Sequence, residues 1–144
     1  MIGILFSIIA GMAMSIQGVM NTRLSEKIGL YESNLFVQGT AFLLSIVAAL
    51  ILGQGNFGPL GEVNRIYLFG GVLGLVITIT VMLGIQGLSP TISISIILIS
   101  QLLVAALIDA FGLLGAERVS FDWTKYLGIA MMIAGVVLFK WQRA

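Results

Sequence analysis

The sequence contains no cysteine and no histidine. Without cysteine the chain forms no disulfide and has no thiol chemistry, and without histidine it lacks the usual proton shuttle near neutral pH. Most transition-metal sites and most catalytic arrangements need one of these residue types or a clustered pair of acids. We therefore expect no metal, no cofactor and no enzymatic activity.

Charged residues are also few. Charged residues make up 9% of the 144 residues and hydrophobic residues 59%, whereas an ordinary globular chain has about 25% charged residues. The mean hydropathy is +1.13. Six acidic and seven basic side chains cannot solvate the surface of a soluble domain of this size. The composition predicts an integral membrane protein in a lipid bilayer, and the net charge of +1 excludes nucleic acid, which needs clustered Lys and Arg.

The remaining sequence consists mainly of five apolar blocks between short polar segments. A membrane-spanning helix needs about 20 apolar residues, and these blocks are too long and too uniformly apolar for the strands of a barrel. We predict one all-α transmembrane domain, residues 1–144, with five spanning helices. The blocks are Ile2–Met20, Ser33–Gly53, Ile66–Leu88, Thr91 to about Leu114, and Tyr126–Phe139.

Two details of these boundaries depend on flanking residues. Trp123 and Trp141 bracket the fifth block, and because tryptophan anchors helices at both membrane interfaces, this span is expected at about 124–141. The polar segment Asn21–Glu32 has two readings. It is either a short interfacial helix or a polar loop that extends the first helix.

Basic residues flank the spans on both sides almost equally. With five spans, one side of the membrane receives Arg23, Lys27, Lys140 and Arg143, and the other receives Arg65, Arg118 and Lys125. The side richer in Lys and Arg usually faces the cytoplasm. A count of four basic residues against three leaves two hypotheses. In the first, copies insert in both orientations and pair antiparallel. In the second, a weak bias sets one orientation, with the C-terminus in the cytoplasm.

Three glutamines, Gln17, Gln38 and Gln101, lie within the predicted spans. Their amides must find hydrogen bonds inside the membrane. They either cross-link neighbouring helices or line a polar cavity. Gln17 shares a helical face with Asn21, and Gln101 shares one with Asp109, so these faces are the better candidates for a substrate pathway of Gln17, Asn21, Gln38 and Gln101.

Asp109 is the one acidic residue of the fourth block. A carboxylate at membrane depth should face protein or water rather than lipid. It is either an interfacial residue, paired with Arg118 or capping a backbone, or a titratable group at a cavity that exchanges a proton for a cationic substrate or holds a cation. Counted from Pro90, it lies near the end of its helix, with Gln101 closer to the middle. We assign it a coupling or gating role.

Glycines of the third and fifth blocks lie at helical spacings that suit contact between helices. Small residues let helices approach closely within lipid. Packing is therefore favoured over direct ligand contact for Gly70, Gly71, Gly74, Gly128 and Gly135.

Several segments in this order resemble the YdcZ-type family of small bacterial inner-membrane proteins. The first is Gln17–Leu24, QGVMNTRL, which is similar to that family's QG-x-x-N-x-x-L signature. The others are Gly70–Gly74, GGVLG; Ser100–Leu103, SQLL; Ile108–Gly115, IDAFGLLG; and Leu127–Val136, LGIAMMIAGV. The resemblance extends over the whole chain at matching spacing.

The resemblance implies membership of the drug/metabolite transporter superfamily, and thus one five-helix half of an inverted-repeat transporter fold. Such a half needs an oppositely oriented partner, either a second copy or a paralogue, and its site lies between the inverted repeats. The expected function is export of a small-molecule substrate by secondary transport across a bacterial inner membrane, with an antiparallel dimer as the acting form. The alternative is a non-transporting subunit or regulatory partner of another membrane protein. Two departures stand out: the first helix has Gln17 rather than an acid, and Ala110 stands where many relatives have histidine.

Overall fold

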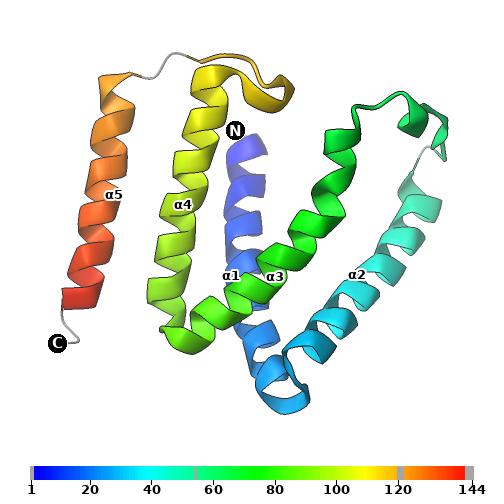
Figure 1. Cartoon of the computed structure of the whole chain (residues 1–144), viewed down its shortest axis with the longest axis horizontal. Coiled ribbons are helices and arrows are strands. Elements are labelled where there is room, and N and C mark those ends of the chain that lie inside the picture. Colours follow the sequence, from blue (N-terminus) through cyan, green and yellow to red (C-terminus); the bar gives the residue numbers. More distant parts are fainter. Residues whose placement is uncertain (1, 54, 120–121, 142–144) are drawn as a thin grey trace. The chain divides into compact units, whose positions relative to one another are not determined.

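The structure, a computed structural model, describes residues 2–53, 55–119 and 122–141, and every regular element among them is helical (Figure 1). Five long helices form the fold, with three short 3₁₀ segments beside them. The long helices are α1 (Ile2–Ile28), α2 (Leu30–Leu52), α3 (Gly70–Gly87), α4 (Pro90–Phe111) and α5 (Trp123–Trp141), and the 3₁₀ segments are Gly58–Gly61, Arg65–Phe69 and Leu113–Gly115.

All five helices are long and apolar enough to cross a membrane, with the third span counted from Arg65. This confirms the predicted all-α fold with five transmembrane helices. The prediction was least accurate at the first block, because α1 continues to Ile28, well past Met20. Arg143, which entered the charge count, lies outside the described residues.

A turn of one residue, Gly29, joins α1 to α2. Its φ of +100° and ψ of 156° belong to a region that is essentially restricted to glycine. Gly29 N donates to Ser25 O at 3.0 Å, and Ser33 N donates to Gly29 O at 3.0 Å. The segment Asn21–Glu32 is therefore neither a separate interfacial helix nor a loop; it is the end of α1, a sharp turn and the start of α2.

Capping residues define α4. Ser89 precedes the helix with extended backbone, and Pro90 occupies its first turn, where the missing N–H costs nothing. Gly112 ends the helix in the left-handed conformation, at φ 63° and ψ 39°, with its N–H bonded to Ile108 O. The helix thus stops at Phe111, three residues before the predicted Leu114.

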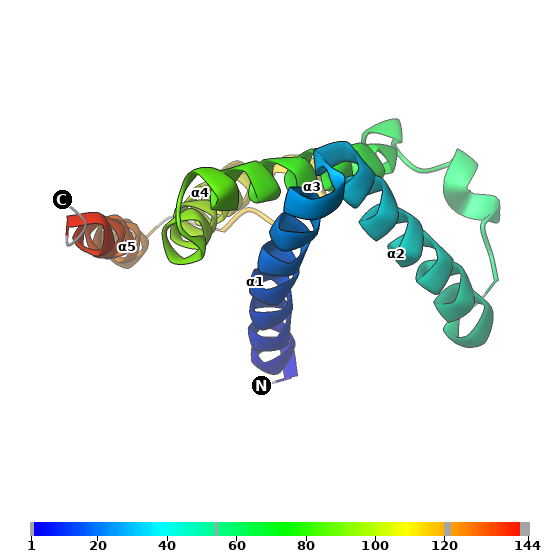
Figure 2. The ribbon, with the colours of Figure 1, turned by 90° about the horizontal axis from the view of Figure 1, so that it is seen from below.

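The chain divides into two compact units, residues 1–87 and residues 88–144. In the first unit, α1 contacts both α2 and α3, and α2 also contacts α3. The end of α1, the start of α2 and the end of α3 converge, while α1 and α2 spread apart away from that point (Figures 1 and 2). The second unit is built on contacts between α4 and α5.

Little apolar surface is buried within this chain. Among the described residues, the buried hydrophobic side chains are Met82, Ile85 and Ile92. Two of them lie on α3, where it meets α1 and α2. The first unit therefore has a small core at one end, and most of the remaining helical surface is apolar and exposed, as expected for a protein solvated by lipid.

Candidate functional site

The buried core of the first unit is mostly polar. We call it the polar junction, and it consists of side chains from the end of α1, the start of α2 and the end of α3. Its buried members are Asn21, Thr22, Ser25, Ser33, Asn34, Met82 and Ile85, and the exposed Gln86 is bonded to it and completes it. Five of them are polar residues that are at most 7% exposed: Asn21, Thr22, Ser25, Ser33 and Asn34.

Gly18 makes the junction possible because it lets α3 approach α1. A Cβ placed on Gly18 would lie 3.1 Å from Ile85 Cδ1 and 3.1 Å from Val81 Cγ1. Such contacts are too tight for a larger side chain. Glycine at this position therefore brings the short polar side chains of the next turns, Thr22 and Ser25, into the interface with α3.

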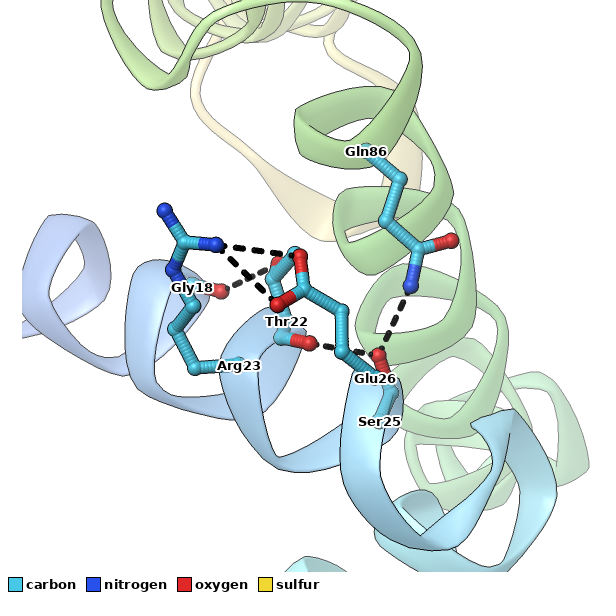
Figure 3. A network of polar contacts seen from close by, with 6 residues as sticks. All are labelled: Gly18, Thr22, Arg23, Ser25, Glu26 and Gln86. Atoms are coloured by element: carbon cyan, nitrogen blue, oxygen red, sulfur yellow. Dashed lines mark hydrogen bonds and ion pairs between the residues drawn. The ribbon is translucent and has the colours of Figure 1, made fainter.

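Hydrogen bonds extend from α1 to α3 (Figure 3). Thr22 Oγ1 donates to Gly18 O at 2.7 Å, and Ser25 Oγ donates to Thr22 O at 2.7 Å. Gln86 Nε2 then donates to Ser25 Oγ at 2.9 Å. The Ser25 hydroxyl is thus donor and acceptor at once, and Gln86 is the residue that links the two helices.

The α2 side of the junction is less well satisfied. Ser33 is fully buried, and its hydroxyl has long contacts only, 3.3 Å to Asn21 O and 3.8 Å to Met82 Sδ. A good O–H···O bond is about 2.7 Å. Asn34 is 4% exposed, and in the described part of the chain its buried Oδ1 has no hydrogen-bond partner. A buried acceptor left in this way costs about 1–3 kcal/mol.

Gln38 lies one turn beyond Asn34 on the same face of α2. Its Nε2 is 3.6 Å from the position that a Cβ on Gly74 would take, and Gly74 O accepts the Thr78 hydroxyl at 2.8 Å. Gln38 and Gly74 therefore lie at the α2–α3 contact, next to the junction. Gln17, by contrast, is exposed although it precedes the buried Asn21 by one turn.

The second unit contains a groove of about 550 Å³ between α4 and α5. Asp109 and Lys125 contribute its charged groups, while the other lining residues are apolar or small: Leu102, Ala105, Ala106, Gly128, Ile129, Met131 and Met132. Asp109 is exposed, as is Gln101 two turns earlier. Arg118 Nε donates to Ala110 O at 3.0 Å, so the guanidinium binds the end of the α4 backbone rather than the Asp109 carboxylate.

Four of the five glycines assigned to helix packing have open space beside them. No atom lies within 4 Å of a Cβ placed on Gly70, Gly71, Gly128 or Gly135. Among the described residues no cluster of three or more acidic side chains is arranged to hold a metal ion.

The sequence analysis did not single out Gly18, Ser33, Asn34 or Gln86 as site residues. A signal was present, because short polar residues occur on both sides of Gly29, at positions 21, 22, 25, 33 and 34. Their concentration next to a residue able to form a sharp turn favours two helix ends packed together. The segment was instead interpreted as a short interfacial helix or as a polar loop that extends the first helix.

The five apolar helices and the polar groups between them define a multi-pass helical membrane protein. A family model described as "Putative inner membrane exporter, YdcZ" matches residues 2–138. The chain therefore belongs to the YdcZ family of inner membrane exporters, which confirms the resemblance seen in the sequence. Comparisons with curated proteins and with solved structures gave no match.

Proposed function

We propose that the protein is a secondary transporter that exports a small molecule by alternating access, and that it acts as an antiparallel dimer. Its membership of an exporter family supports transport rather than catalysis. Its five spans are an odd number, so two oppositely oriented copies would create the inverted repeat on which many carriers are built. The near balance of basic residues on the two sides allows both orientations.

The exposure of polar side chains on membrane-spanning helices carries this proposal. Gln17 and Gln101 lie within candidate spans and are exposed in the single chain, and so is Asp109 near the end of its span. In hydrocarbon such groups must be covered by protein or by a water-filled cavity. A second copy, together with an aqueous pathway between the copies, supplies both.

In this pathway the roles follow from chemistry and position. Gln17, Asn21, Gln38 and Gln101 supply neutral amides that recognise polar groups of the substrate, with Asn21 and Gln38 at the packed end of the first unit. Asp109 supplies the charge that couples transport to protons or holds a cation at the mouth of the α4–α5 groove.

The test is flux through purified protein in liposomes. A screen for compounds that raise the melting temperature first identifies ligands, because a ligand of the folded state stabilises it. Uptake of such a ligand is then measured with and without a pH gradient. We expect Asp109→Asn to abolish pH-driven flux while insertion and dimerisation remain normal. Flux with an unchanged pH profile would make Asp109 a structural residue, and ligand binding without any flux would favour a non-transporting subunit.

The dimer is tested separately by topology. A reporter fused to the C-terminus is assayed on both faces of the membrane. Antiparallel homodimers place equal signal on the two faces. A signal on one face removes the homodimer and leaves pairing with an oppositely oriented paralogue, which co-purification would identify.

A further inference from the structure

We propose that the polar junction is a gate of the transport pathway, closed in this structure, and that it opens when the end of α3 moves away from α1 and α2. This inference rests on the proposed transport function and locates one of its two gates. The gate lies at the membrane face that carries Arg23 and Lys27, because both residues belong to the last turns of α1.

The shape of the first unit supports a closed end and an open one. The helices are packed from Gly18 to the end of α1, where the buried residues lie. Away from the junction α1 and α2 spread apart in both views of the ribbon (Figures 1 and 2). At Gly3 and Gly11 of α1, a Cβ would meet no atom within 4 Å.

The moving part follows from the connections between the helices. α1 and α2 are joined through Gly29 alone, and backbone hydrogen bonds run from Gly29 to both helices. They are expected to move as one body. α3 is held to them by side chains: the Gln86–Ser25 bond, the long Ser33–Met82 contact and the packing of Ile85 against Gly18. Separation of α3 therefore breaks side-chain contacts but no backbone hydrogen bond of the Gly29 turn.

The energetics suit a gate as well. Opening a junction of apolar side chains would expose only groups that form no hydrogen bonds with water. Here opening exposes hydroxyls and amides that water can satisfy, and Asn34 Oδ1 gains a partner that it lacks in the closed state. The unsatisfied acceptor destabilises the closed state relative to the open one. This brings the two states closer in free energy, which a carrier needs in order to alternate between them.

A reversible cross-link tests the gate, and the absence of native cysteine removes any background. In the double variant Gly18→Cys/Val81→Cys, the Cβ on residue 18 lies 3.1 Å from Val81 Cγ1 and no other Val81 atom is within 4 Å of it. The two Cβ atoms are therefore more than 4 Å apart, towards the upper end of the range of about 3.5–4.5 Å found in disulfides. We expect oxidation to stop flux in liposomes and reduction to restore it. The two single variants are the matched controls, and the flux of each should be the same under oxidising and reducing conditions. Full flux in the oxidised double variant would overturn the gate while leaving transport intact.

A second measurement needs no flux, so it separates failure of the gate from failure of the proposed function. Asn34→Cys is labelled in native membranes with a membrane-impermeant maleimide, beside the exposed control Lys27→Cys. We expect Asn34→Cys to reach the same final extent of labelling as the control, but about tenfold or more slowly, because the reagent reaches residue 34 only when the junction opens. Labelling only after denaturation would show that the junction does not open, and labelling as fast as the control would show that it is not closed; either result overturns the proposal. Slow labelling without flux in liposomes would support a mobile junction and count against transport.

Discussion

The two units of this protein use their polar residues in opposite ways. In residues 1–87 several short polar side chains are buried where three helices meet, as with Ser25, Ser33 and Asn34. In residues 88–144 the conspicuous polar groups, Gln101 and Asp109, are exposed, and α5 has no buried residue. The first unit holds its helices together with polar contacts, whereas the second presents a groove and a carboxylate to something outside the chain.

From this difference we expect substitutions in the first unit to change stability and substitutions in the second unit to change transport. Changes at the polar junction should alter how strongly α1, α2 and α3 are held together. Changes at the α4–α5 groove should leave folding nearly unaffected and act on the partner subunit or on flux. Melting temperatures of the purified protein in detergent test this division, from the largest expected effect to the smallest.

Gly18→Leu should cause the largest loss. Val81 and Ile85 lie 3.1 Å from the position of the new Cβ, so a leucine must push α3 away from α1. Overpacking of this kind costs about 1–3 kcal/mol. The control is Gly11→Leu on the same helix, where the space is open. Equal melting temperatures of the two variants would show that α1 and α3 are not packed at Gly18.

Asn34→Leu should raise the melting temperature instead of lowering it. It replaces a buried amide whose Oδ1 has no partner by an apolar side chain of similar size, and removing such an acceptor is worth about 1–3 kcal/mol. A more stable closed junction should also slow transport. A clear loss of stability would mean that the Asn34 amide is satisfied in the folded protein.

Gln86→Leu should have a smaller effect, a loss of about 0.5–1.5 kcal/mol, because it removes one hydrogen bond to Ser25 at 2.9 Å. Once Ser25→Ala is present, adding Gln86→Leu should cost almost nothing further, since the bond between the two side chains is already lost. Full additivity in this double-mutant cycle would contradict a Gln86–Ser25 interaction.

Asp109→Asn should change the melting temperature least. The side chain is exposed and nearly the same size after substitution. Its effect belongs to flux, which liposome assays measure, and native gels should show an unchanged dimer. A large loss of stability in this variant would contradict the expectation that substitutions in the second unit leave stability nearly unchanged.

Hydropathy alone was enough to predict five helices, because lipid requires each backbone to satisfy its own hydrogen bonds. The prediction that Gln17 and Asn21 share an environment depended on helical periodicity. Periodicity places both residues on one side of α1, but it does not show along which part of α1 another helix is packed. In this chain the contact with α3 begins at Gly18, so Asn21 is buried and Gln17 is exposed.

The sequence by itself determined that this is a five-helix membrane protein of an exporter family, because the length and composition of each apolar block decide whether it spans a bilayer. The tertiary structure decided where the polar groups lie. The turn at Gly29 folds α2 back on α1, and the close approach at Gly18 brings in α3. The turn is local, but the contact with α3 joins segments distant along the chain. Together they bury short polar side chains of this segment in a junction.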